Sequence, residues 1–177
     1  MNPLDLARRT WWEAEPHLLG RERAAVSTAF PELVWSAEGP GSWTGSLPPW
    51  PFKRPAPANL EVLLGDAPFE VRVHYSHAFP AAPPAIFPLA PEPAVHIRSF
   101  TTHHVLGDGS LCLLRDADQW TTSSSTTDLI LKAAGWRIEY ALFEHAKLDS
   151  LTENGIVIDD RLDQLIVSTI EELRGAS

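Results

Sequence analysis

The sequence predicts a single α+β domain spanning residues 1–177, in which strand-like segments come as a run and long helices follow them. Alternation of apolar and polar residues over 69–75 is typical of a half-buried antiparallel strand. A helical pattern of apolar residues covers 129–143. With 177 residues, 44% of them hydrophobic, the chain is long enough for one domain with a sizeable core.

The N-terminal part of the chain predicts two helical segments and a short strand. Asn2 and the proline after it supply a cap and a first turn for a helix that reaches about Glu15. A second helical segment from Gly20 has to end near Pro31, because the residue before a proline disfavours helical geometry. Residues 32–36 are then expected to form the first strand.

The middle of the chain predicts a loop followed by a hairpin. Five prolines argue against a central strand in 43–57, so we expect an ordered surface loop there. Residues 60–64 and 69–75 predict two paired strands that turn at Gly65. His74 falls on the polar side of the alternation and should face solvent. These strands form part of a three- to four-stranded antiparallel meander.

Two further helices are predicted in the C-terminal third. Ser125 and Asp128 have the spacing of a capping box at the start of the first helix, which should pack over a broad face. Asp159 and Asp160 are expected to cap the last helix. Its apolar residues recur through 162–170 at helical spacing.

The composition indicates which kinds of partner and which cellular compartment to expect. The chain has 23 acidic and 14 basic side chains, and its formal charge of −9 argues against a nucleic-acid partner. One cysteine cannot form an internal disulfide, so a reducing compartment, the cytoplasm, is expected. The N-terminus lacks the apolar core of a signal peptide, and no apolar run approaches the roughly 20 residues of a membrane span.

The segment 102–113 holds the chain's only cysteine, Cys112, behind a pair of histidines and a Gly-Asp-Gly turn. Gly107 and Gly109 flank Asp108, and this combination favours a sharp reversal. The thiol therefore follows directly on a turn, which is a position suited to a nucleophile. A buried structural thiol is the competing interpretation, since free cysteine is among the most buried residue types.

Two segments resemble ubiquitin-conjugating enzymes. The first is His103-His104-Val105 with Asp108-Gly109-Ser110-Leu111-Cys112-Leu113 and Gln119-Trp120, which resembles their active-site segment. The second is the aromatic-Pro-x-x-Pro-Pro-x-aliphatic run at 79–86, which resembles the entry to their fourth strand, although a proline-rich linker has the same composition. Prolines at 88–93 form an insertion relative to typical members. The resemblance covers roughly 33–140 and is closer to the bacterial members, which often keep a histidine near this point.

The resemblance implies the ubiquitin-conjugating fold: an N-terminal helix, an antiparallel meander, an active-site loop and C-terminal helices. It also implies a transferase in which Cys112 accepts a ubiquitin-like protein from an activating enzyme as a thioester. The acyl group then passes to an amine of a target protein, so that two easier acyl transfers replace one difficult step. The bacterial members sit in operons with both partners, and their role in antiviral defence is implied too. No cofactor and no metal are expected.

The resemblance also implies roles for individual residues. His104 stands where the family's His-Pro-Asn motif has asparagine, which implies a donor to the acyl oxyanion or a brace for the loop; a neutral imidazole can donate one hydrogen bond. A purely structural histidine is the alternative. Four residues are expected to support the site: His103, Asp108, Gly109 and Trp120. Any of Asp108, Asp116 and Asp118 could orient an incoming lysine or raise the pKa of the cysteine, but the sequence favours solvated turn and loop acids for each of them.

Arg8 and Arg9 are the expected contact for the activating enzyme, because the family docks that partner on its N-terminal helix. A solvated basic face explains the same pair of residues.

Three other functions remain open at this stage. A noncatalytic module of the same fold would bind a ubiquitin-like protein without a thioester. A cysteine hydrolase would pair Cys112 with His103 or His104, but the papain-like order needs a downstream histidine and only His145 follows. A zinc site is weakly supported, because one cysteine and two adjacent histidines do not make a ligand set.

Overall fold

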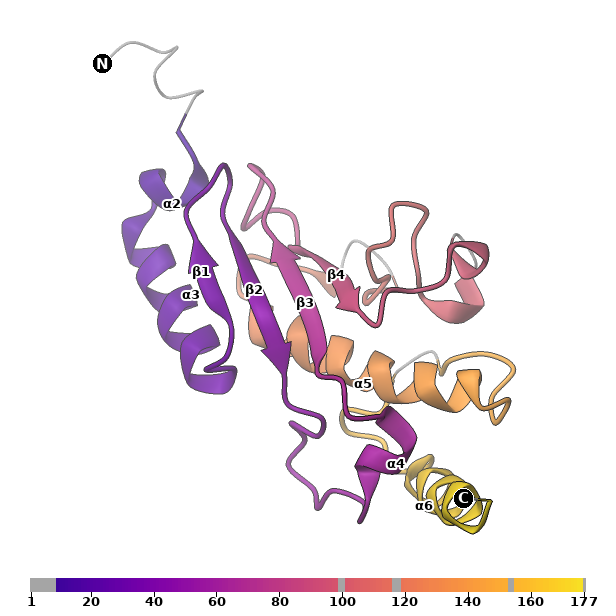
Figure 1. The fold of residues 1–177 in the computed structure, drawn as a ribbon. Coiled ribbons are helices and arrows are strands. Elements are labelled where there is room, and N and C mark those ends of the chain that lie inside the picture. The colour runs from indigo at the N-terminus through magenta and orange to yellow at the C-terminus, as the bar shows by residue number, and fades with distance from the viewer. Residues whose placement is uncertain (1–8, 99–100, 116–118, 153–154, 177) are drawn as a thin grey trace.

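The computed structural model describes residues 9–98, 101–115, 119–152 and 155–176. The chain forms a mixed α+β structure around a four-stranded antiparallel sheet in which neighbouring strands follow the order β1-β2-β3-β4 (Figure 1). The strands are β1 (Val34–Ser36), β2 (Ser42–Leu47), β3 (Phe69–His74) and β4 (Ala85–Ala90). The predicted α+β class and antiparallel meander are therefore confirmed.

β2 corrects the prediction of a surface loop over 43–57. This strand pairs with both β1 and β3, so it lies inside the sheet. The first proline, Pro48, follows the last residue of β2, so the prolines end the strand and do not prevent it. Gly45 allows the close approach of the preceding segment, because a Cβ at Gly45 would lie 2.1 Å from the carbonyl oxygen of Glu32.

The predicted strand at 60–64 is wrong, since these residues form the short helix α4 (Leu60–Leu64). Leu60 and Leu63 are buried on the same side of that helix, in an apolar cluster away from the sheet. β3 instead pairs with β2 and β4, and its alternation of buried and exposed residues confirms the predicted half-buried strand. His74 is exposed, as predicted.

The proline-rich stretch at 88–93 is not wholly an insertion, because Pro88 lies within β4. β4 is an edge strand of the sheet, where the missing N–H of a proline is tolerated. Pro88 pairs with Val71 next to a register shift between Glu70 and Val71.

The helices at the N-terminus are α2 (Trp11–Ala14) and α3 (Pro16–Ala29). Thr10 caps α2 in a capping box with Glu13, so the predicted helix does not run unbroken to Glu15; the predicted cap at Asn2 lies outside the described residues. α3 ends one residue before Phe30-Pro31, as predicted.

An aromatic cluster fixes α2 to the sheet. The ring of Trp11 lies 5.1 Å from Tyr75 and 4.6 Å from Phe79, centroid to centroid, and its indole N–H donates to the carbonyl of Pro40 at 2.7 Å. The Tyr75 hydroxyl donates to Glu22 on α3 at 2.9 Å, and burial raises the pKa of Tyr75. These contacts fix the position of the N-terminal helices against the sheet.

The C-terminal helices are α5 (Thr126–Glu144) and α6 (Asp163–Gly175), and two 3₁₀ turns, η1 (Val95–Ile97) and η2 (Thr101–His103), follow β4. Ser125 caps α5, but it accepts from the N–H of Thr127, one residue earlier than the capping-box spacing predicts. The predicted cap of α6 is wrong, because Leu162 is its N-cap residue, and the Asp159 carboxylate accepts from Arg161 instead.

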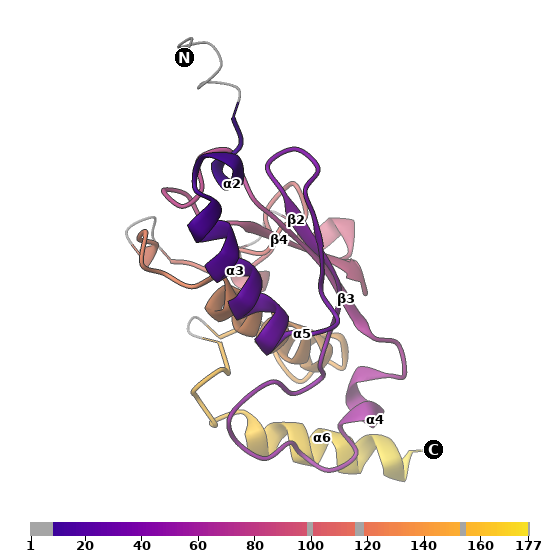
Figure 2. The ribbon, with the colours of Figure 1, turned by 90° about the vertical axis from the view of Figure 1, so that its left-hand side faces the viewer.

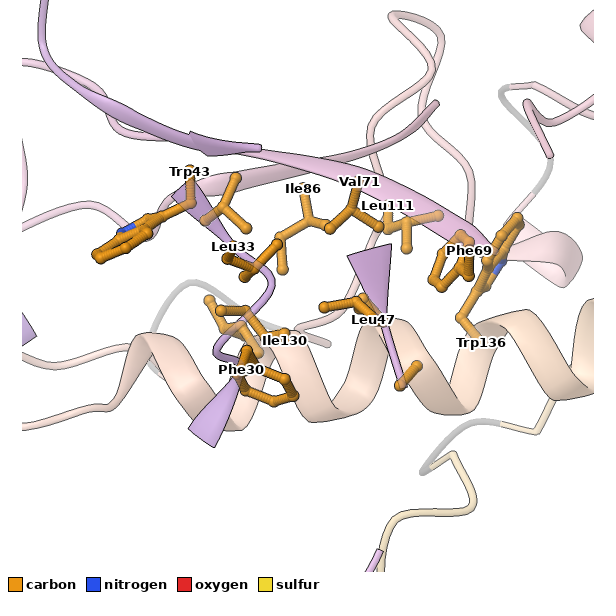
Figure 3. Packing of buried hydrophobic residues seen from close by; sticks show 14 of the residues in the cluster. Phe30, Leu33, Trp43, Leu47, Phe69, Val71, Ile86, Leu111, Ile130 and Trp136 are labelled. Carbon is orange, nitrogen blue, oxygen red and sulfur yellow. The ribbon is translucent and has the colours of Figure 1, made fainter. Parts of the chain in front are cut away.

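The main core lies between one face of the sheet and α5. Figure 3 shows apolar side chains of the sheet facing Ile130 and Trp136, together with Phe30 from the end of α3 and Leu111 from the segment after β4. The broad packing face predicted for α5 is confirmed, since its buried residues include Leu129, Ile130, Ala133, Ala134, Trp136, Ile138, Tyr140 and Ala141. A second cluster lies where α4 and α6 meet the other end of α5 (Figures 1 and 2).

Arg54 connects the proline-rich segment after β2, residues 48–57, to α6. Its guanidinium makes two hydrogen bonds to Asp163, at 2.7 and 2.9 Å, and another to the carbonyl of Val157 at 3.0 Å. It also lies over the rings of Trp50 and Phe52. Residues after β2 are therefore an ordered segment that covers the second cluster.

Candidate functional site

Cys112 lies at the end of a small hairpin that is fixed to the edge of the sheet. Val105 and Leu111 form an antiparallel bridge, and the N–H of Cys112 donates to the carbonyl of His104 at 2.9 Å. The N–H of Leu111 donates to the carbonyl of Ile86 in β4, also at 2.9 Å. The backbone at the thiol is thus held on both sides, by its own hairpin and by the sheet.

The hairpin turns at the Gly-Asp-Gly segment, as the sequence predicts. The Asp108 carboxylate accepts from the N–H of Ser110 at 2.9 Å and from its hydroxyl at 2.6 Å, and these bonds lower the pKa of Asp108. Gly109 has φ 88°, a conformation that favours glycine. Asp108 and Gly109 therefore shape the turn, and Asp108 remains ionised there.

The two histidines are held by their backbone carbonyls. The indole N–H of Trp136 on α5 donates to the carbonyl of His103 at 3.0 Å. The His103 ring lies 4.6 Å from the ring of Phe143, and burial, with the nearby His96 and His104, lowers the pKa of His103. His104 has φ 52°, in the left-handed region that non-glycine residues rarely adopt.

A cavity of about 570 Å³ opens beside the thiol. The hairpin forms one wall, α5 forms a second, and Leu151, Thr152 and Gly155 form a third. The residues that line it include Cys112, His104, Lys132, Trp136, Glu139 and Thr152. The sequence-predicted pair Cys112 and His104 therefore borders one cavity.

The thiol itself is half-buried. Its Sγ donates to the carbonyl of Leu114 at 3.6 Å, and the Nζ of Lys132 donates to the carbonyl of Leu113 at 3.1 Å. The two carbonyls that follow Cys112 are thus both engaged, which keeps the short segment after the nucleophile in one conformation.

Trp120 anchors the segment that follows. Its indole N–H donates to the carbonyl of Pro80 at 2.8 Å, and its ring lies 6.3 Å from the ring of Phe79. The two stretches singled out in the sequence, 79–86 and 103–120, are therefore in direct contact.

Sequence reasoning missed Lys132 and Glu139. Both lie on α5 with Trp136 between them, at positions i, i+4 and i+7, and so share one face of the helix. Two ionisable residues on an otherwise apolar face were the signal that could have identified them. Glu139 is 1% exposed, and its carboxylate accepts from both the N–H and the hydroxyl of Thr152.

The pKa of Glu139 gives a testable pH dependence of stability. Burial raises this pKa above its ordinary value of 4.5, against the opposing effect of the hydrogen bonds from Thr152. At a pH between the ordinary pKa and the raised pKa, the folded protein keeps a proton that the unfolded chain has released. The free energy of unfolding therefore falls as the pH rises through this interval. In that interval the slope reaches about 1.4 kcal/mol per pH unit for one group.

Glu139→Gln should remove this slope, because glutamine can satisfy Thr152 without titrating. Urea unfolding of both proteins across pH 4–8 measures it. As the pH rises above 4.5, we expect the free energy of unfolding of the wild type to fall relative to that of the variant. Parallel curves would show that Glu139 keeps its ordinary pKa in the fold.

The remaining predicted residues lie elsewhere. Arg9 is exposed just before α2, which Figure 1 places on the other side of the sheet from the segment that follows β4. Arg8, Asp116 and Asp118 lie outside the described residues. Within the ranges that the structure describes, no group of three His, Cys, Asp or Glu side chains could hold a metal ion, and no helix is long and apolar enough to cross a membrane.

No family model matches the sequence, and no curated protein matches it.

Proposed function

We propose that this protein is a conjugating transferase of the bacterial ubiquitin-conjugating type. It carries a ubiquitin-like protein as a thioester on Cys112 and transfers it to an amine of a target protein. The observation that carries the proposal is the position of the chain's only thiol, half-buried at the wall of a cavity of about 570 Å³. A thiol packed in the core would have favoured the structural interpretation.

The order of elements around Cys112 supports the same fold family. An antiparallel meander precedes the cysteine segment, and a long helix packs across the sheet after it, as the resemblance leads us to expect. The matched residues at 79–86 and Trp120 also touch, which gives the two segments of the resemblance a shared structural role.

The chemistry needs one nucleophile and a place for the acyl group. The Cys112 thiolate attacks the carbonyl carbon of the activated modifier, a new C–S bond forms, and the thiol of the activating enzyme leaves. In the second step an amine nitrogen attacks the same carbon, and the C–S bond to Cys112 breaks. An oxyanion develops in each step and needs a hydrogen-bond donor.

His104 is our candidate for that donor. This residue lines the cavity, and its backbone lies at φ 52°. Asparagine and histidine are among the few residues enriched at positive φ, so His104 suits the backbone of a position where the family has asparagine. Its carbonyl also accepts from the N–H of Cys112, so its backbone and the nucleophile are directly linked.

Two alternatives are less well supported. A Cys-His hydrolase needs an imidazole that takes the thiol proton, whereas the Cys112 thiol donates to the carbonyl of Leu114 and the His103 ring packs on Phe143. A noncatalytic binding module would not need an accessible thiol. We accordingly infer an activating enzyme and a ubiquitin-like protein as partners, a cytoplasmic location and a part in antiviral defence.

The test is incubation with a bacterial activating enzyme, its ubiquitin-like protein and ATP. Intact-mass spectrometry should show the protein plus one modifier, less one water, and a thiol reductant should remove that mass. A modifier that binds without any covalent product would identify the noncatalytic module instead.

The contact with the activating enzyme gives a further prediction. Reversing Arg8 and Arg9 to glutamate should slow loading through slower association, and added salt should shrink the difference between variant and wild type. Arg174→Glu is the matched control, because Figures 1 and 2 place its helix, α6, at the opposite end of the molecule from α2. Stopped-flow loading rates at low and high salt measure the effect. Equal rates at low salt would favour a solvated basic face.

A further inference from the structure

The chain has three lysines, Lys53, Lys132 and Lys147, and one of them borders the cavity of Cys112. Lys132 lies on α5 and is half-buried there. Lys53 is exposed in the proline-rich segment, and Lys147 forms an ion pair with Glu172 of α6. A protein proposed to hand acyl groups to amines thus has an amine of its own beside the nucleophile.

The contact of Lys132 places this amine close to the thiol. Its Nζ lies 3.1 Å from the carbonyl oxygen of Leu113, the residue directly after Cys112. Seven covalent bonds separate that oxygen from Sγ, so standard bond lengths keep the oxygen within about 9 Å of Sγ, and Nζ within about 12 Å of it. The flexible four-carbon stem of lysine can rotate the amine away from the carbonyl. The cavity that both residues line, with a volume of about 570 Å³, has room for an acyl chain.

We propose that Lys132 is an internal acceptor, to which an acyl group carried on Cys112 passes within one molecule. This inference rests on the proposed function. The uncharged amine of Lys132 attacks the thioester carbonyl carbon, and a C–N bond forms. The C–S bond breaks with its electron pair on sulfur, and the proton released from nitrogen restores the Cys112 thiol. Atoms and charge balance without any further reactant.

The product is an amide, which thiols do not cleave. Because Lys132 borders the same cavity, the attached chain would occupy the space beside Cys112. The modification would therefore limit further loading of the protein.

The probe for this inference is a synthetic fluorescent peptide that ends in Gly-Gly and carries a small-thiol α-thioester. It loads Cys112 by thiol exchange, so the experiment needs no activating enzyme. Lys132→Arg is the central variant, because arginine keeps the positive charge and can donate to the carbonyl of Leu113, but its guanidinium is not a nucleophile. Lys147→Arg and Lys53→Arg are matched controls. Cys112→Ala controls for direct acylation of lysine.

We expect a reductant-resistant adduct to accumulate on Lys132 of the wild type as the thioester decays, with peptide mapping locating it. Lys132→Arg should form the thioester normally and lower the rate of the resistant adduct at least tenfold. Lys147→Arg and Lys53→Arg should match the wild type. Melting temperatures should agree among the variants.

The inference is overturned if Lys132→Arg or Cys112→Ala forms the resistant adduct at the wild-type rate, or if the wild-type thioester only hydrolyses. A thioester on Cys112 without an adduct on Lys132 contradicts this inference alone. Failure of Cys112 to take up the peptide at all contradicts the proposed function as well.

Discussion

Cys112→Ala is expected to abolish the covalent adduct with the ubiquitin-like modifier completely and to leave the fold intact. No other side chain in the sequence offers a thiol. The thiol is half-buried and makes one weak hydrogen bond, to the carbonyl of Leu114, so its loss should cost about 1 kcal/mol of stability. Intact mass with and without reductant, together with thermal unfolding, measures both effects.

Cys112→Ser is the matched variant for this prediction. A hydroxyl in place of the thiol should trap an oxyester that survives reductant and is cleaved by hydroxylamine. A reductant-sensitive adduct in Cys112→Ala would overturn the assignment of Cys112 as the nucleophile. Retention of noncovalent binding by every variant, without any mass change in the wild type, would identify a binding module.

Long periodic patterns in the sequence predicted their elements well. The alternation over 69–75 gave β3, and the apolar stripes after Ser125 gave α5, because many residues of each pattern agree. The stretch 60–64 could not be assigned in this way, since five residues with four apolar side chains fit either a strand or a helix. Tertiary contacts favour the helix, because Leu60 and Leu63 pack in one apolar cluster with residues of α6.

Part of the candidate site could be predicted because its residues are close in sequence. Cys112 and His104 are close in sequence, and a tight hairpin at Asp108 keeps them close in space. Lys132 and Glu139 come from a helix that returns past the hairpin after more than a dozen intervening residues. Their position relative to the hairpin depends on how α5 packs across the sheet. A local sequence pattern does not predict that packing.

His104→Ala should slow acyl transfer by about 10²–10³-fold if its imidazole donates to the oxyanion. The substitution also changes the backbone, because φ is 52° and alanine lacks the polar side chain that eases this conformation. The left-handed conformation costs roughly 1–2 kcal/mol. For a chain of this length each kcal/mol lowers the melting temperature by about 2–4 °C. Slow transfer in this variant alone would therefore not separate a donor from a brace.

His104→Gly separates the two, since glycine accepts positive φ without strain and has no donor. If the imidazole is the donor, the glycine variant should melt near the wild type and discharge a preformed thioester as slowly as the alanine variant. His104→Asn should recover part of the rate, because asparagine tolerates this backbone and its amide donates. The measurement is single-turnover discharge to a free amine beside the melting temperature of all four proteins. Discharge at the full rate from the glycine variant would mean that the backbone at His104, and not its ring, serves the reaction.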